Sequence, residues 1–205
     1  MGRLSPSFFA RDTLEVARDL LGQRLVRIVN GRRLSGRIVE VEAYVGEEDL
    51  ACHASRGRTR RTEVMYGPPG HAYVYFIYGM YHCLNVVTER EGFPAAVLIR
   101  ALEPVEGVDV MRAHRGCRDD RELTSGPGKL CVALQIDRRL NGIALYDHGE
   151  LFLDEDEPVA SDRTATSTRV GIKVPGWAAE APWRVYVADS PFVSGARRPT
   201  RTTIR

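Results

Sequence analysis

Two glutamates and a tyrosine, spaced two residues apart, form the first group in this chain that could carry out acid–base chemistry. Glu40, Glu42 and Tyr44 share a stretch, residues 37–45, in which they alternate with small apolar residues. An acidic loop follows and leads to His53. Carboxylates beside a phenol and an imidazole can exchange protons, so they are candidates for a general acid or base. A solvated strand face is the plainer alternative, because single exposed glutamates on strands are common.

The alternation predicts a β-strand over residues 34–45 with two unlike faces. Since successive side chains of a strand point to opposite sides of the sheet, one face should be core and the other should line up the acidic groups. The predicted core face carries Val39, Val41, Ala43 and Val45, and the other carries Ile38, Glu40, Glu42 and Tyr44. A strand over residues 24–29 and the turn Asn30-Gly31 precede it, which is a strong hairpin signal.

Arg100 interrupts an otherwise apolar strand predicted over residues 95–102. An arginine in a buried strand is costly unless a partner neutralises it. Glu40 and Glu42 are candidate partners from the acidic strand. A structural ion pair with Glu103 or Glu106, a few residues further on, is an equally open alternative.

The second informative stretch is an aromatic β-hairpin with an unusual tip. Strands are predicted over residues 72–77 and 82–88, on either side of a break at Gly79. Hairpin tips are normally polar because water solvates the turn. This tip instead carries Tyr78, Met80 and Tyr81. The tip is therefore either tucked under another part of the protein or a wedge for a partner.

The basic residues are nearly all arginines, and several of them share one loop. Of 29 basic residues only Lys129 and Lys173 are lysines, and the net charge is +2. Arginine suits phosphate, although a GC-rich genome would produce the same bias. Residues 56–61 form either a solvated turn or a phosphate-binding loop, and Lys129 opens a helix predicted to end near residue 134. The candidates for contacts to a phosphate backbone are Arg56, Arg58, Arg60, Arg61 and Lys129.

The rest of the sequence predicts one domain over residues 1–205, with a frayed tail from about residue 196. No apolar run reaches membrane-spanning length and the first residues lack a signal-peptide core, so a cytoplasmic protein is expected. A monomer is expected because no surface stripe demands a partner. Four cysteines without a Cys-x-x-Cys pair are expected to be free thiols. The remaining predicted elements are helices over residues 6–21 and 105–114, and strands over residues 145–153, 168–173 and 184–187.

Several ordered blocks of the chain, from about Leu14 to Ser194, resemble the 3-methyladenine (alkyladenine) DNA glycosylase family. The resemblance implies a mixed α/β (α+β) fold, a compact domain with a curved antiparallel sheet, flanking helices and a protruding β-hairpin. It also implies a monofunctional base-excision repair enzyme whose partner is double-stranded DNA containing damaged purines, acting at the bacterial nucleoid. The blocks are residues 37–44 with His53, residues 73–81 with Cys83 and Asn85, residues 98–104, and residues 121–131.

The resemblance also implies a role for individual residues. Glu42, rather than Glu40, matches the general base, and Arg100 matches the arginine that helps to hold the attacking water. The implied substrates are 3-methyladenine, 7-methylguanine, hypoxanthine and ethenoadenine in DNA. No lysine lies in the hairpin to form a Schiff base, so the reaction should stop at an abasic site. The other matches are Tyr44, His53 and Tyr75 for the walls of the base pocket, Asn85 for the residue that crowds the guanine 2-amino group, and Tyr78 and Met80 for the residues that enter the DNA.

Three other functions remain open from the residues alone. A metal site could form if Cys52-His53 and His82-Cys83 met near His71, but neighbours on a strand point to opposite faces, so no metal or cofactor is expected. A lesion-sensing or RNA-binding module would use the tip and the basic loop without chemistry. A nucleoside or O-glycoside hydrolase would use the carboxylate without the tip.

Overall fold

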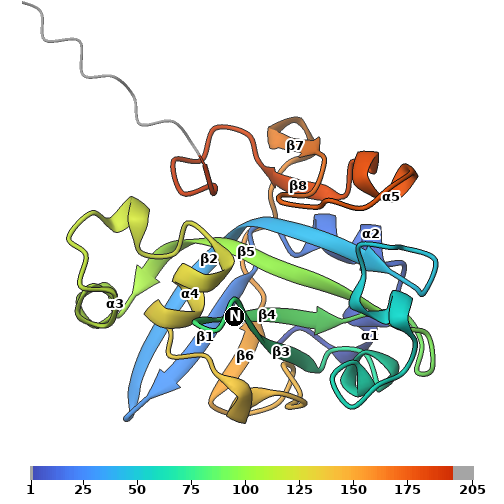
Figure 1. The fold of residues 1–205 in the computed structure, drawn as a ribbon. Helices are drawn as coiled ribbons and strands as arrows, with labels where there is room; N and C mark the ends of the chain where they lie inside the picture. The colour runs from blue at the N-terminus through green and yellow to red at the C-terminus, as the bar shows by residue number, and fades with distance from the viewer. Residues whose placement is uncertain (1, 196–205) are drawn as a thin grey trace, which may run out of the picture.

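The computed structural model describes residues 2–195 of the chain. The frayed tail predicted from about residue 196 lies outside the described residues. One curved antiparallel sheet organises the described part, and short helices pack around it (Figure 1). The fold class implied by the resemblance is therefore confirmed. Within residues 2–195, no helix is both long and apolar enough to cross a membrane.

Eight strands form the sheet, and the two longest lie side by side at its centre (Figure 1). These are β2 (Arg32–Val45) and β5 (Ala95–Glu106). The path across the sheet runs β3, β4, β5, β2, β1 and β6, so the sheet stays open. The second edge of β2 is divided, because β1 pairs with its first half and β8 with its second half. The shorter strands are β1 (Arg24–Val29), β3 (Ala72–Ile77), β4 (Tyr81–Val87), β6 (Leu151–Asp154), β7 (Thr164–Ser167) and β8 (Arg184–Val187).

The helix predicted over residues 6–21 is wrong as one element, because two helices occupy that range. They are α1 (Pro6–Phe9) and α2 (Thr13–Asp19). Asp12 separates them, and its carboxylate accepts hydrogen bonds from the backbone N–H groups of Leu14 and Glu15. A side chain that satisfies these amides starts a new helix instead of continuing the old one.

The other helices are short and lie in the connections between strands. Of these, α4 packs against β4 and β5, where it closes one end of the site described below. The α-helices are α3 (Val108–Arg115), α4 (Pro127–Ala133) and α5 (Trp177–Glu180). The 3-10 helices are η1 (His53–Arg56), η2 (Glu63–Tyr66), η3 (Asp120–Glu122), η4 (Arg138–Leu140) and η5 (Ser161–Arg163).

Three predicted boundaries are corrected by the structure. The strand predicted over residues 145–153 is only its end, β6, because residues 145–150 are turn and bend. The strand predicted over residues 168–173 is wrong: β7 ends at Ser167 and the following segment is irregular. The helix predicted from residue 105 starts at Val108, since β5 continues through Pro104 to Glu106.

Three irregularities interrupt the register between β2 and β5, and two of them flank Glu40. Ile38 faces Leu102 and Val41 faces Ile99, and between these pairs the register skips Val39 on one strand and Arg100 on the other. The predicted two-face pattern is therefore wrong before Glu40. Ile38 packs in the main core with Val41, whereas Val39 packs in a separate cluster. Bulges of this kind often re-aim side chains next to active sites.

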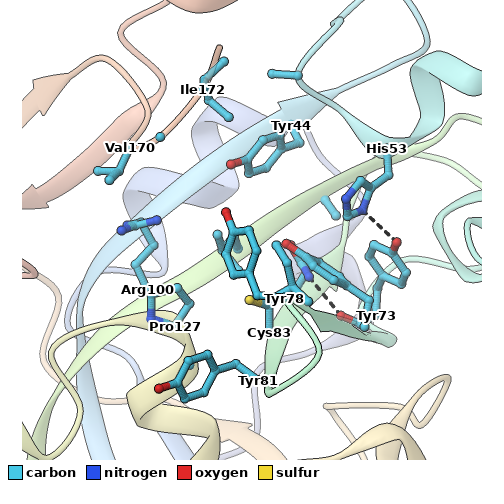
Figure 2. Close-up of a pocket in the computed structure, with 18 of the residues that line it drawn as sticks. Tyr44, His53, Tyr73, Tyr78, Tyr81, Cys83, Arg100, Pro127, Val170 and Ile172 are labelled. Atoms are coloured by element: carbon cyan, nitrogen blue, oxygen red, sulfur yellow. Dashed lines mark hydrogen bonds between the residues drawn. The ribbon is translucent and has the colours of Figure 1, made fainter. Parts of the chain in front are cut away.

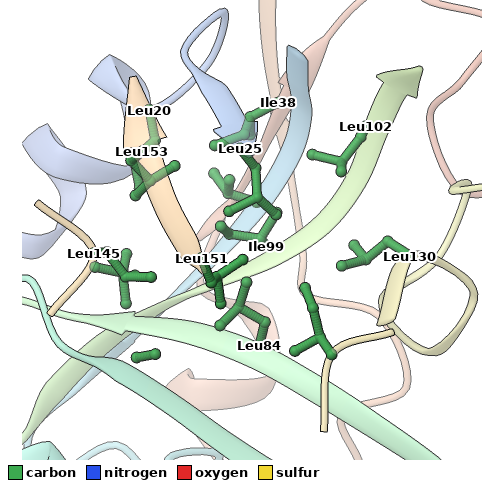
Figure 3. Close-up of a cluster of buried hydrophobic side chains, with 14 of the residues drawn as sticks. Leu20, Leu25, Ile38, Leu84, Ile99, Leu102, Leu130, Leu145, Leu151 and Leu153 are labelled. Atoms are coloured by element: carbon green, nitrogen blue, oxygen red, sulfur yellow. The ribbon is translucent and has the colours of Figure 1, made fainter. Parts of the chain in front are cut away.

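The main hydrophobic core packs against one face of the sheet (Figure 3). Leucines and isoleucines from the central strands meet residues that follow α2 and residues of α4. Burial of such side chains stabilises the fold by about 1.5–3 kcal/mol each. The side chains labelled in Figure 3 are Leu20, Leu25, Ile38, Leu84, Ile99, Leu102, Leu130, Leu145, Leu151 and Leu153.

Candidate active site

A cavity of about 340 Å³ opens on the other face of the sheet (Figure 2). Its size falls in the range of small-molecule pockets, about 300–1,000 Å³. One side consists of side chains from β3, β4 and β5, and the opposite side consists of Tyr44 with the irregular segment 170–172. His53 and the first residues of α4 complete the rim. The lining is mostly aromatic and apolar, with Arg100 and Asn85 as its polar groups from the central strands.

Glu42 lies directly behind this cavity. Its side chain is fully buried, and three groups that contact its carboxylate line the cavity. The Tyr44 hydroxyl donates to Oε2 at 2.8 Å, and the Val170 N–H donates to Oε1 at 2.6 Å. The Arg100 guanidinium nitrogen Nη1 lies 3.3 Å from Oε2. The carboxylate is thus fixed on both oxygens one side chain away from the cavity.

Glu40, two residues earlier, is equally buried but has a different environment. Its carboxylate accepts hydrogen bonds from Arg100 at 2.9 Å and Arg184 at 2.7 Å. It also accepts from the backbone and the hydroxyl of Ser194, at 2.6 and 2.7 Å. Burial alone would raise the pKa of Glu40, but the Arg100 charge and these bonds hold it below its ordinary value. Glu40 therefore serves as a saturated structural anion.

These contacts decide two alternatives that the sequence left open. The solvated strand face is wrong, because both glutamates are fully buried. Of the two open alternatives for Arg100, the structure shows the pairs with Glu40 and Glu42, whereas Glu106 pairs with Arg33. Burial acts to lower the pKa of Arg100, but the two carboxylates overcome it and raise the pKa above its ordinary value.

Aromatic rings and an imidazole line the side of the cavity away from Arg100. The His53 ring meets the Tyr75 ring edge to face, with 4.5 Å between centroids. His53 Nδ1 lies 2.9 Å from the Tyr73 hydroxyl, and a dashed line marks this contact in Figure 2. Burial, together with the charges of Arg61 and Arg56, lowers the pKa of His53 to about 4. The imidazole is therefore neutral at pH 7, and burial likewise raises the pKa of Tyr73 to about 12.

Asn85 lines the cavity from β4, next to Leu98 across the strand pair. The side chain is buried, and its Nδ2 donates to the Tyr73 carbonyl oxygen at 3.0 Å. This bond fixes the amide group against the cavity wall. The predicted pocket residues Tyr44, His53, Tyr75 and Asn85 are therefore gathered around one cavity.

The hairpin tip projects from the rim and is not tucked under the protein. β3 and β4 pair as far as Ile77 and Tyr81, which leaves a loop of Tyr78, Gly79 and Met80. Tyr78 is 82 % exposed and Met80 is 63 % exposed. Tyr78 has a φ of +56°, a left-handed conformation that costs a non-glycine residue strain energy. An exposed, strained aromatic tip is typical of a functional contact.

Tyr81 joins the base of the tip to α4. Its ring packs against Gly128, where an added Cβ would lie 2.9 Å from the ring. Glycine at this position lets the ring lie on the helix backbone. Tyr81, Pro127 and Gly128 all line the cavity, so the hairpin and the start of α4 form one continuous rim.

The five predicted phosphate contacts are not in one environment. Arg58 pairs with Glu63 at 2.7 Å and Lys129 pairs with Glu122 at 2.5 Å. The Arg61 guanidinium lies 5.1 Å from the centroid of the Tyr75 ring, over its face. Arg56 and Arg60 are exposed in the same loop as Arg58 and Arg61. The loop therefore borders the cavity, but two of the five cations already have carboxylate partners.

Sequence reasoning missed the segment that forms the opposite wall. Val170, Gly171 and Ile172 line the cavity, and Arg169 lies behind them, fully buried against Asp49. The strand predicted over residues 168–173 gave no indication that this segment lines a cavity. The one feature of the sequence that could have identified this segment is an arginine beside apolar residues. The same feature marks Arg100 in the strand predicted over residues 95–102.

The residues considered for a metal site do not form one. Among the described residues, no group of three or more His, Cys, Asp or Glu side chains lies close enough to hold a metal ion. All four cysteines are free thiols, and burial raises the pKa of Cys52 to about 12. His71 instead packs edge to face against the Tyr146 ring.

Comparisons with known proteins point in one direction. The family model described as methylpurine-DNA glycosylase matches residues 7–191. A relative from Methanocella arvoryzae, named "Putative 3-methyladenine DNA glycosylase", is 55% identical over 192 residues, covering 93% of this chain and 95% of the relative. Relatives of the same name are 51% identical in Carboxydothermus hydrogenoformans, covering 93% and 98%, and 48% identical in Alkaliphilus oremlandii, covering 94% and 98%.

Proposed function

Because this chain belongs to the methylpurine-DNA glycosylase family, we propose that it flips damaged purines from duplex DNA and hydrolyses their N-glycosidic bond with an activated water. The proposed substrates are alkylated or deaminated purines: 3-methyladenine, 7-methylguanine, hypoxanthine and ethenoadenine. The proposed product is an abasic site in an intact strand. The protein would act as a single domain and as a monomer.

One observation carries the proposal: a purine-sized cavity lies between a buried carboxylate and an exposed aromatic hairpin tip. The carboxylate of Glu42 contacts three groups of the cavity wall. Tyr78 lines the same cavity and is exposed, and Met80, two residues further along the tip, is exposed as well. A base inside a duplex is out of reach of such a carboxylate, so it must first leave the stack. The two features together fit base flipping followed by chemistry on the extruded nucleotide.

The hairpin tip would take the place of the extruded nucleotide. Unstacking a base costs a few kcal/mol, and less when the base is damaged or mispaired. Apolar side chains inserted from the minor groove offset this cost by stacking in the gap. Tyr78 would occupy the gap and Met80 would contact the neighbouring stack.

The aromatic walls would bind the extruded base by stacking. Tyr44, His53 and Tyr75 all line the cavity, and the rings of His53 and Tyr75 meet edge to face. Stacking on aromatic rings is worth about 1–3 kcal/mol per base and tolerates many purines. The buried Asn85 would exclude normal guanine by crowding its 2-amino group.

Glu42 would act as the general base. It would take a proton from water as the water oxygen attacks the anomeric carbon, and the purine would leave with the bonding electron pair. General base catalysis contributes about 10²–10⁴ in rate, and the negative charge would also stabilise an oxocarbenium-like transition state. Arg100 contacts Glu42 and lines the cavity, so it would orient the carboxylate and help to hold the water.

The absence of strand cleavage is part of the proposal. A lyase reaction needs an amine that can form a Schiff base with the sugar. Both lysines, Lys129 and Lys173, lie within residues 2–195, and neither lines the cavity. A conjugated aldehyde or a nicked product from the pure protein would overturn this part alone.

The direct test is base release from a duplex with one hypoxanthine, at stated salt, with alkali treatment to reveal abasic sites. The wild-type protein should release the base from the damaged duplex and not from an undamaged control. Glu42→Gln should bind the damaged duplex within a few-fold of wild type while its rate falls by about 10²–10⁴. Glu48→Gln, an exposed glutamate on the loop after β2, is the matched control and should keep the wild-type rate.

Other outcomes would favour the other functions. Damage-selective binding by wild type without any base release would indicate a lesion-sensing module. Efficient cleavage of free nucleosides would indicate a nucleoside hydrolase. Such a reaction needs no duplex and therefore no hairpin tip that enters one. Equal rates for Glu42→Gln and wild type would remove Glu42 as the base.

A further inference from the structure

Arg169 is the most completely enclosed cation near the cavity. Its side chain and that of Asp49 both have zero exposure. The guanidinium forms two parallel bonds to the Asp49 carboxylate, at 2.5 and 2.8 Å. It also donates to the carbonyl oxygens of Ala43, at 3.0 Å, and Ala178, at 2.8 Å. One side chain therefore links the end of β2, the acidic loop after it and α5.

The same guanidinium lies between two aromatic rings. It is 4.8 Å from the centroid of the Tyr44 ring and 5.0 Å from that of Trp183. Arg169 does not line the cavity, whereas Tyr44 does, so the cation sits behind the ring that faces the cavity. Cation–π contacts of this kind are worth up to about 2 kcal/mol when desolvated. The position of the Tyr44 ring is thus set from behind.

Arg169 is also next in sequence to the peptide group that holds Glu42. The Val170 N–H donates to Glu42 Oε1 at 2.6 Å, and the Tyr44 hydroxyl donates to Oε2 at 2.8 Å. These are two of the three contacts to that carboxylate, and the third is Arg100. Arg169 is linked to both donors. It forms the peptide bond with the nitrogen of Val170, and its guanidinium lies over the ring of Tyr44.

We propose that Arg169, clamped by Asp49, is a positioning residue that holds both hydrogen-bond donors of Glu42 in place. The proposal rests on the proposed function, in which Glu42 is the base. Arg169 would not touch the purine or the water. Its effect would pass through the Val170 peptide group and the Tyr44 hydroxyl to the carboxylate.

The local backbone explains why such a clamp is needed. β7 ends at Ser167 and the segment from residue 168 to α5 belongs to no strand or helix in the structure. A strand ladder would orient its own peptide groups, but here the Val170 N–H must be aimed by side chains. The planar fork of an arginine fixes direction as well as distance. A buried ion pair is a poor source of stability, so orientation is the better account of its presence.

The test compares Arg169→Lys in two backgrounds by single-turnover base release from a hypoxanthine duplex. Lysine keeps the charge but loses the fork. In the wild-type background the rate should fall about tenfold to a hundredfold, as for small misplacements of a catalytic group. Affinity for the duplex should stay within about threefold. In a Glu42→Asp background, whose shorter side chain already withdraws the carboxylate from both donors, Arg169→Lys should lower the rate less than threefold.

Arg24→Lys is the matched control. Arg24 forms a partly buried two-nitrogen contact with Asp156 at the far edge of β1 and touches no group of the cavity. It should leave the single-turnover rate unchanged in both backgrounds. If Arg169→Lys fails to fold, Asp49→Asn replaces it, because the amide removes the ionic clamp while keeping its shape.

The outcomes separate the two proposals. An equal loss of rate in both backgrounds, or no loss in the wild-type background, would overturn the positioning role while leaving Glu42 as the base. A wild-type rate for Glu42→Gln would overturn the base assignment and the positioning role together. Loss of rate that depends on an intact Glu42 supports both.

Discussion

We call the buried charge cluster behind the cavity wall the floor. The floor and the hairpin tip differ in exposure and in hydrogen bonding. The floor is a buried charge cluster of Glu40, Glu42 and Arg100, in which every carboxylate oxygen accepts hydrogen bonds. The tip, Tyr78 to Met80, is exposed and strained, with one backbone bond from Met80 to Ile77 across it. The side chains of the floor are fixed by several neighbouring groups, whereas the side chains of the tip are exposed.

The difference teaches where stability and function are coupled. A buried charge that loses its partner is left without water to replace it, so changes in the floor should unfold the protein as well as inactivate it. An exposed side chain has no such dependence, so changes in the tip should affect activity alone. The two regions can therefore be separated by measuring stability and base release on the same variants.

The largest effect is expected for Glu40→Ala. Removing this anion leaves the buried Arg100 and the partly buried Arg184 without their shared partner, which should lower the free energy of unfolding by about 3–5 kcal/mol. Urea denaturation at pH 7 measures the change. Glu63→Ala, which breaks the exposed pair with Arg58, is the control and should have little effect. A Glu40→Ala protein as stable as wild type would show that the floor does not differ from the tip in its contribution to stability.

The next effect is expected for Tyr78→Gly. Glycine accepts the positive φ without strain, so the free energy of unfolding should stay within about 0.5 kcal/mol of wild type. Base release from a hypoxanthine duplex should fall about tenfold to a hundredfold, because one stacking contact of about 1–3 kcal/mol is lost. Tyr78→Phe keeps the ring and should keep the activity. An unstable Tyr78→Gly protein would show that the tip is part of the folded framework.

A smaller effect concerns His53 and acid stability. Its pKa is about 6.5 in the unfolded chain and is lowered to about 4 in the fold by burial and by Arg61 and Arg56. The unfolded state therefore binds a proton first as pH falls, so stability present above pH 6.5 is lost progressively toward pH 4. His53→Gln should lose less stability over this window in urea titrations. His148→Gln, at an exposed site, should match wild type. Identical curves for all three proteins would show that the lowered pKa of the partly buried His53 does not affect acid stability.

The smallest effect is expected for Arg60→Gln in the loop beside the pocket. Arg60 is exposed, so a contact to one phosphate should weaken binding evenly for damaged and undamaged duplexes. The slope of log K against log salt should decrease by about 0.9 for one lost phosphate contact. Arg58→Gln should change the slope less, because Arg58 already pairs with Glu63. Equal slopes for Arg60→Gln and wild type would exclude this contact.

Much of the fold could be predicted because its signals are local. The Asn30-Gly31 turn, the strand Arg24–Val29 and the hairpin around Gly79 each depend on a few neighbouring residues, and all three are present. A cation in an apolar strand needs an anion, so the sequence predicted an acidic partner for Arg100 but left open which glutamates supply it; the structure shows Glu40 and Glu42. The predicted helix over residues 6–21 was divided because capping by Asp12 outweighs apolar spacing.

The sequence by itself determined which residue types were present: two acids two residues apart, an arginine in an apolar strand and an aromatic hairpin tip. Only the tertiary structure decided their environments, since Glu40 is saturated by Ser194 and Arg184 from distant segments, while Glu42 contacts Tyr44 and Val170 of the cavity wall. Paired bulges at Val39 and Arg100 shift the faces of both strands. Such bulges, and the clamp of Asp49 on Arg169, arise from contacts between residues far apart in the chain, and no local pattern encodes them.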